Sequence, residues 1–272
     1  MELTDWLVFS SAVFIGSYIQ SIAGFAMGMI LISVCGANGT IALPELTATV
    51  SLVSFANIVV ALRGHLRSIE RRLLSWLALG QLPAVAAGFL LMGILDRNAQ
   101  WLLQLLLGLF ITAGSLSMMF RPIPLATLSP RWACLVAGMS GGLFGGLFSA
   151  SGPIIGWFAY RQPLELSVIR ATLLAFFGIA TLVRSSIVAL HGGLTSHVFE
   201  LVGLALPLVI LGSWLGQKAP PRVTDATLKR MVFTLLLLMG LYITLNANSL
   251  ISVINNQTTI DATTPQSVTP RH

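Results

Sequence analysis

Long apolar runs constrain the fold of this chain more than any other feature. Six of them have about the twenty residues that a helix needs to cross the hydrocarbon core of a bilayer, at 41–62, 73–95, 101–120, 171–190, 198–215 and 231–250. Only 9% of the 272 residues are charged, whereas about a quarter of a soluble domain is charged. So few charged side chains cannot cover a water-exposed surface. The sequence therefore predicts an all-α integral membrane protein.

Two further apolar segments, 6–34 and 132–159, are too long for one upright span and too short for two. Small residues interrupt both near the middle, Ala23 and Gly24 in the first and the run 149–153 in the second. We expect each segment to be a broken helix whose break lies near the membrane midplane. The polar residues 251–272 are predicted to form a disordered tail.

Short matches that keep their order indicate an internal repeat. The residues Gly16 and 21–24 precede similar residues at 141 and 146–149 by 125 positions. Residues 61–66 match 189–194, and 108–111 match 240–243. The two predicted halves, 1–125 and 126–250, each contain one broken segment followed by three spans. Chance similarity among Leu- and Gly-rich helices is the alternative, which the collinear order disfavours.

The basic loop residues separate two arrangements of this repeat. If the broken segments cross the membrane, the halves are parallel and the basic residues divide seven to seven between the two faces. If the segments are re-entrant hairpins, the halves are inverted and one face collects Arg63, Arg67, Arg71, Arg72, Arg121, Arg131, Arg161, Arg170, Lys218, Arg222, Lys229 and Arg230. The other face then keeps only Arg97 and Arg271. Cytoplasmic loops collect Lys and Arg, so the sequence predicts hairpins, inverted halves and both termini outside.

The net charge of +6 would suggest a nucleic-acid partner in a soluble chain. Here the basic residues act as topology determinants in loops. We therefore expect the lipid bilayer, and no nucleic acid, as the large partner. A homo-oligomer is compatible with the sequence.

The two breaks have the chemistry of an anion site. A half-helix that begins inside the membrane presents free N–H groups and the positive end of its dipole. At the second break, Ser149 and Ser151 supply hydroxyls, and Gly152 allows a ligand to approach the backbone closely. Pro153 is suited to the first position of a helix. The first break offers Gln20, Ser21 and Gly24.

Close helix packing is the alternative role of small residues. We favour packing for Gly141, Gly142, Gly145 and Gly146. For residues 149–153 we favour a binding role, because a proline in the middle of a segment breaks a helix instead of packing it.

The segments around both breaks resemble the two signatures of the TauE/SafE family of bacterial membrane permeases. Residues 16–25 (GSYIQSIAGF) resemble the first signature, and residues 138–153 (GMSGGLFGGLFSASGP) resemble the second. The resemblance covers about residues 5–247. It implies a multi-pass inner-membrane protein that transports small anions, often sulfite, sulfonates or related organosulfur compounds. The second signature usually has more glycine where residues 149–151 stand here.

Polar residues inside the spans are further candidates. Arg184 lies several residues inside its span, and a buried charge in a membrane usually faces a cavity or a partner. It could hold an oxyanion in its planar fork; alternatively it snorkels to the outer interface. Asn57 aligns with Ser185 across the repeat, so both halves are expected to place a polar group at the same depth.

These features together predict a secondary transporter of small anions that works by alternating access at a midplane site. No carboxylate is predicted deep inside a span, and His191 and His197 have no acidic helper at metal-ligand spacing. We therefore expect no metal, no cofactor and no enzymatic activity. The alternative function is a non-transporting membrane accessory or assembly protein.

Overall fold

The computed structural model describes residues 3–38, 41–119, 124–218, 234 and 236–245 of the chain. This part is mainly helical and contains no strand. Its helices are α1 (Leu3–Ala23), α2 (Met27–Asn38), α3 (Leu43–Ala61), α4 (Arg71–Asn98), α5 (Gln100–Met119), α6 (Arg131–Phe148), α7 (Gly152–Tyr160), α8 (Leu166–Leu190) and α9 (Ser196–Lys218). A short 3₁₀ helix, η1 (Leu66–Ser68), precedes α4, and another apolar helix spans Leu236–Leu245.

Six of these helices, α1, α3, α4, α5, α8 and α9, are long and apolar enough to cross a membrane. Five of them coincide with predicted spans. Of the sixth predicted span, 231–250, the structure describes residue 234 and the apolar helix Leu236–Leu245, and the predicted tail 251–272 lies outside the described residues. Many large apolar side chains are exposed, among them Leu79, Ile94 and Trp214. Such a surface suits contact with lipid.

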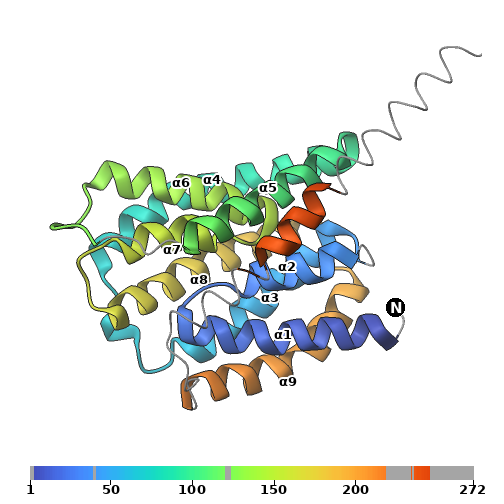
Figure 1. Cartoon of the computed structure of the whole chain (residues 1–272), viewed down its shortest axis with the longest axis horizontal. Helices are drawn as coiled ribbons and strands as arrows, with labels where there is room; N and C mark the ends of the chain where they lie inside the picture. The colour runs from blue at the N-terminus through green and yellow to red at the C-terminus, as the bar shows by residue number, and fades with distance from the viewer. Residues whose placement is uncertain (1–2, 39–40, 120–123, 219–233, 235, 246–272) are drawn as a thin grey trace, which may run out of the picture.

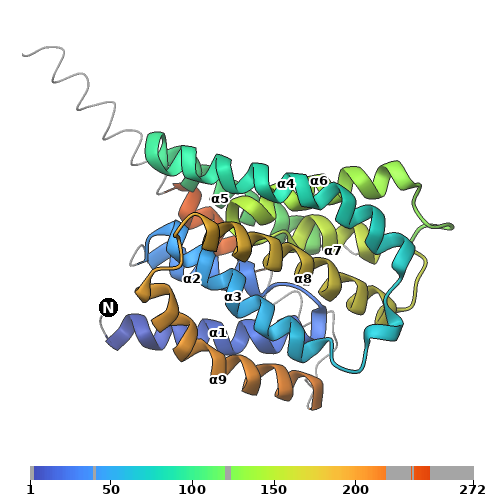
Figure 2. The ribbon, with the colours of Figure 1, turned by 180° about the vertical axis from the view of Figure 1, so that it is seen from behind.

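The helices lie side by side, and most run along the long axis of the molecule (Figures 1 and 2). One end of this bundle, the amino end, holds the start of α1 and the links α2–α3, α4–α5 and α8–α9. The opposite end, the basic end, holds the links α3–α4, α5–α6 and α7–α8. Arg63, Arg67, Arg131 and Arg161 lie in or beside the links at the basic end.

Both predicted breaks are present. The first separates α1 from α2 and the second separates α6 from α7. In each case the chain turns back, so that α2 runs against α1 and α7 runs against α6 (Figure 1). The two broken segments are therefore helical hairpins.

The first hairpin differs from its prediction. Its first arm, α1, has 21 residues, or about 31 Å at 1.5 Å per residue, which is enough for a full span. The Ala23 carbonyl accepts a hydrogen bond of 2.9 Å from the Tyr160 hydroxyl at the end of α7. The break consequently starts near the basic end and not near the middle, because α1 begins earlier than the apolar run suggested.

Glycines allow close parallel packing of two helix pairs. On α6, Gly138, Gly142 and Gly146 lie against Leu77, Gln81 and Val85 of α4, in the same chain order. On α9, Gly212 and Gly216 lie against Phe14 and Tyr18 of α1, again in the same order. A Cβ at any of these glycines would meet backbone atoms of the neighbouring helix. The packing role predicted for Gly142 and Gly146 is confirmed.

Candidate functional site

A small cavity lies where the two hairpins meet, and α3 and α8 close its sides. It has about 30 Å³ of free volume, room for roughly one water molecule. Five predicted site residues line it: Gln20, Ser149, Ser151, Gly152 and Arg184. The other lining residues are Phe25, Ala26, Gly28, Met29, Ser54, Ile58, Gly145, Ala150, Phe177, Ala180 and Thr181.

The first break approaches the cavity through an irregular turn. Gly24 has a φ of 81° and Ala26 a φ of 107°, a left-handed conformation that is costly for a residue with a Cβ. Gln20 fixes the turn, because its Oε1 accepts a 3.1 Å hydrogen bond from the backbone N–H of Met27, the first residue of α2. The Gln20 Nε2 is buried and has no hydrogen-bond partner. This amide therefore stabilises the start of α2 and keeps a free donor beside the cavity.

The second break is built around Ser149, whose φ of 54° ends α6 in the left-handed conformation. Its hydroxyl lies 2.7 Å from that of Ser51 on α3. Ser151 and Gly152 then begin α7 at the cavity wall. Pro153 follows at the first helical turn and packs against Gly114 of α5, outside the cavity.

The two breaks are in direct contact. A Cβ placed on Gly28 would be 2.5 Å from the carbonyl oxygen of Ser149, and one placed on Gly152 would be 2.9 Å from the ring of Phe25. The first turns of α2 and α7 therefore adjoin the same space. Both carry N–H groups without a partner inside their own helix and the positive end of a helix dipole. The arrangement favours negative charge in the cavity.

Arg184 on α8 is 1% exposed and does not snorkel to an interface. Its Nε donates to the Gly146 carbonyl (3.0 Å), and its Nη1 donates to the Thr47 carbonyl (2.9 Å) and the Ser51 hydroxyl (2.9 Å). Its Nη2 donates to the Thr47 hydroxyl (2.8 Å) and to the Met92 sulfur (3.5 Å). All these acceptors are uncharged. Within the described residues no carboxylate pairs with the guanidinium, which is thus a buried positive charge without a counter-charge.

Sequence reasoning missed Ser54. It lies on α3, is 4% exposed and lines the cavity, and its hydroxyl is buried without a hydrogen-bond partner. Thr47, Ser51 and Ser54 recur at spacings of four and three residues, which places them on one face of a helix. This polar stripe in an otherwise apolar helix is the signal that identifies Ser54.

Four predicted site residues lie elsewhere, in addition to Pro153. Gly24 packs against the backbone of Arg170, and Ser21 donates to the Ser17 carbonyl at 2.9 Å. Asn57 donates to the Ser17 carbonyl (3.1 Å) and to the Ser213 hydroxyl (2.6 Å), which ties α3 to α1 and α9. Ser185 has a buried hydroxyl that does not line the cavity.

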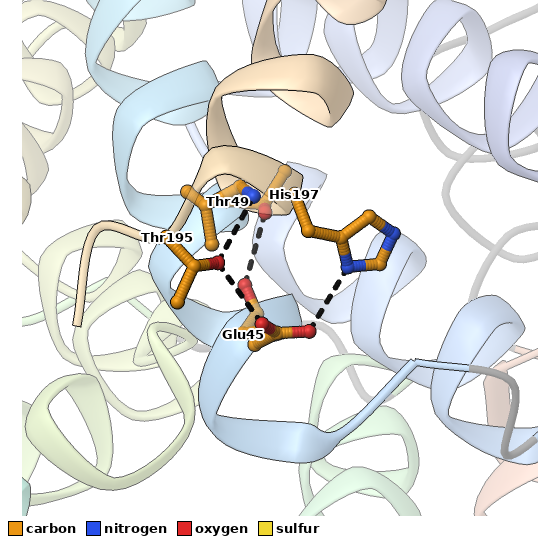
Figure 3. Close-up of polar contacts among 5 residues, drawn as sticks. Glu45, Thr49, Thr195 and His197 are labelled. Carbon is orange, nitrogen blue, oxygen red and sulfur yellow. Dashed lines mark hydrogen bonds and ion pairs between the residues drawn. The ribbon is translucent and has the colours of Figure 1, made fainter.

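A polar cluster connects α3 with α9 at the amino end (Figure 3). Glu45 accepts hydrogen bonds at 3.0 Å from the Thr195 hydroxyl and lies 3.0 Å from Nδ1 of His197. Thr195 in turn accepts from the backbone N–H of Val198 and so caps α9. His197 belongs to the first turn of α9. In the part of the chain that the structure describes, no group of three His, Cys, Asp or Glu side chains could hold a metal ion.

Comparisons with known proteins agree with this architecture. The family model described as Sulfite exporter TauE/SafE matches residues 8–243. A relative from Cupriavidus necator, named as a probable sulfite/organosulfonate exporter TauE, is 38% identical over 234 residues, which are 86% of this chain and 91% of the relative. The probable inner membrane transporter protein TsaS of Comamonas testosteroni is 29% identical over 179 residues, 64% of this chain and 74% of that protein. No solved structure matches the chain significantly.

The match thus extends from α1 to the helix Leu236–Leu245, and it includes both hairpins and the cavity between them. The relatives carry the names of membrane transporters, in keeping with the membrane-spanning helices found here. This chain is a multi-pass inner-membrane transporter that belongs to the TauE/SafE sulfite exporter family.

Proposed function

We propose that this transporter carries a small oxyanion, sulfite or an organic sulfonate, through the cavity between the two hairpins. The observation that carries the proposal is a pair of buried donors without partners, Gln20 Nε2 and Ser54 Oγ, both from residues lining the cavity. A buried polar group without a hydrogen bond is costly. A ligand that accepts hydrogen bonds would remove this cost.

The charges around the cavity favour a negatively charged ligand. The cavity is bordered by two helix starts and by Arg184, while its lining contains no carboxylate. Arg184 and both helix starts would repel a cation there, whereas an anion would provide the counter-charge that Arg184 lacks. The relatives' names refer to sulfite, organosulfonates and inner-membrane transport, which agrees with a sulfur oxyanion as substrate.

The binding step requires movement, because 30 Å³ does not accommodate a sulfonate group of four heavy atoms. An oxyanion in contact with Arg184 would replace at least one of its present acceptors, Thr47, Ser51 or Gly146. These residues belong to α3 and α6. Substrate binding would therefore loosen the contact between the second hairpin and α3, which is a route to alternating access.

We further propose that residues 1–125 and 126–250 are inverted repeats. Two reciprocal contacts support this: a Cβ at Gly108 would meet Thr244, and a Cβ at Gly240 would meet Thr112. Gly108 is equivalent to Gly240, and Thr112 to Thr244, because the members of each pair are 132 positions apart. Exchanging the two halves therefore turns one contact into the other, as a two-fold relation requires. The parallel pairs α1–α9 and α6–α4 support it as well, since each joins the first helix of one half to the fourth helix of the other.

The proposed orientation places the basic end in the cytoplasm. Single cysteines at Arg67, beside the basic end, and at Asn98, at the amino end, would test it with a membrane-impermeant thiol reagent. Cys35 and Cys134 are 4% and 3% exposed, so their background labelling should be low. We expect intact cells to label the cysteine at 98, and the cysteine at 67 only after permeabilisation. The reverse pattern would refute the orientation.

Uptake into proteoliposomes tests the site. We expect Gln20→Leu and Ser54→Ala each to raise the half-saturating concentration of sulfite about two- to tenfold, because a hydrogen bond to an uncharged donor contributes roughly 0.5–1.5 kcal/mol. Ser186→Ala is the control, since the Ser186 hydroxyl is exposed and bonds only the Leu182 carbonyl of its own helix. Unchanged half-saturation in both cavity variants would show that these donors do not contact the anion.

A further inference from the structure

A second concave surface lies on the outside of the bundle, between α5 and α7. One stripe of α5, from Leu106 to Ser117, forms one wall, and the α7 residues from Pro153 to Trp157 form the other, with Phe144 of α6 between them. The groove encloses about 510 Å³, a volume typical of ligand sites. Its walls are almost entirely apolar, and Leu109 and Trp157 are exposed along it.

The dimensions of the groove match one leaflet of a bilayer. Leu106 and Ser117 are eleven positions apart on a continuous helix, or about 16 Å. Half of a hydrocarbon core of about 30 Å is roughly the same length. The α7 wall of the groove ends at Trp157, three residues before α7 itself ends at Tyr160, near the basic end.

A cation lies beside this end of the groove. The guanidinium of Arg161, the residue that follows α7, lies 4.6 Å from the centre of the Trp157 ring. Within the described residues no carboxylate pairs with Arg161. The groove therefore combines an apolar slot with an unneutralised positive charge at one end, which lies toward the cytoplasmic headgroups in the orientation proposed above. Tryptophan is enriched at the depth of the headgroups.

We propose that this groove binds one anionic phospholipid, with an acyl chain along α5 and the phosphate against Arg161. A chain-shaped slot ending in a cation complements a lipid whose charge is at one end. Basic groups at the cytoplasmic side of a membrane attract anionic headgroups in this way. The groove is separate from the transport cavity, but Pro153 packs against Gly114 on the groove side while Gly152 lines the cavity. A lipid bound here would pack against the first turn of α7 on the side opposite the cavity and stabilise it.

The test compares phosphatidylglycerol with phosphatidylcholine of the same acyl chains, added to the purified full-length protein in detergent. We expect phosphatidylglycerol to raise the midpoint of thermal unfolding by about 3–6 °C when it is present at tenfold its apparent dissociation constant. Phosphatidylcholine should raise it less. Native mass spectrometry should count one tightly retained phosphatidylglycerol per chain, and this readout does not depend on unfolding.

Two variants and two controls locate the site. Ala113→Phe fills the groove from an exposed position on α5 and should abolish retention of the lipid; Leu116→Phe, exposed on the same helix but outside the groove, should not. Arg161→Gln should weaken the binding of phosphatidylglycerol about fivefold, which is the effect expected of one basic residue near a charged headgroup. Arg131→Gln removes a similar arginine, 5.4 Å above Trp76 and away from the groove, and should have no effect.

Three results would overturn the proposal. The first is equal stabilisation of the unmodified protein by both lipids. The second is undiminished lipid retention by both Ala113→Phe and Arg161→Gln. The third is a disulfide cross-link between two copies that carry Ala113→Cys in the membrane, which would assign the groove to a second copy of the chain.

Discussion

Replacing Gly152 with leucine should abolish anion uptake while the protein still reaches the membrane in folded form. Gly152 lines the cavity at the start of α7, and a Cβ there would already be 2.9 Å from the Phe25 ring. That ring is 1% exposed and packs edge-on against Tyr160 with 6.0 Å between centroids, so it has little room to move. A leucine side chain would fill the cavity and cover the N–H groups at the helix start.

Proteoliposome uptake, normalised to the amount of folded protein, measures this effect. Gly152→Ala adds only the Cβ and should retain part of the activity. Gly203→Leu is the control, because a Cβ at this position of α9 meets nothing within 4 Å. Wild-type uptake by well-expressed Gly152→Leu would mean that the tip of the second hairpin has a packing role only.

Substitution of Arg184 should give the second large effect. Arg184→Lys keeps the charge but cannot make five hydrogen bonds in one plane, so the half-saturating concentration should rise. Arg184→Gln also removes the charge and should raise it about ten- to hundredfold, since a charge-assisted hydrogen bond contributes roughly 1.5–3 kcal/mol. Concentration-dependent uptake by both variants is the measurement, with Arg97→Gln at the amino end as the control.

The same measurement separates ligand binding from a purely structural role. Arg184 bonds residues of α3, α4 and α6, so its loss is also expected to lower the yield of folded protein. A purely structural arginine would lower the yield and the maximal rate but leave half-saturation unchanged in the molecules that fold. Unchanged half-saturation in both variants would exclude Arg184 from the anion site.

Much of the fold can be predicted from the sequence because lipid imposes a simple requirement on the chain. Every backbone polar group in the hydrocarbon region must be satisfied within the segment, so apolar length predicts helices, and five predicted spans correspond to α3, α4, α5, α8 and α9. The breaks can be predicted because small and helix-breaking residues stand together there, Ala23 and Gly24 at the first and residues 149–153 at the second. A single proline is not enough, since Pro83 lies inside α4 and Pro207 inside α9. The length of α1 could not be predicted from the sequence, because Leu3, Thr4 and Asp5 are helical in the structure despite the polar start of the chain.

The candidate site is only partly legible. Gln20, Ser149, Ser151, Gly152 and Arg184 line the cavity because they lie at the breaks or are polar in a span. Ser21 and Asn57 satisfy the same criteria but bond to α1 and α9. Which way a polar side chain points around its helix depends on the register between neighbouring helices. That register is set here by glycines such as Gly212 and Gly216, and it requires the three-dimensional structure.

The composition of the cavity wall has a consequence for the anion binding proposed above. Among the described residues that line it, Arg184 is the only ionisable one, and an arginine stays protonated throughout the physiological range. The wall consequently presents the same charge in mildly acidic and mildly alkaline solution. If the proposed anion binds there, we expect any gain or loss of affinity across that range to originate in the ligand, through the fraction of molecules that carry a negative charge. As the proposed anion site, the cavity would thus distinguish the ionised form of an acid from its neutral form without titrating itself.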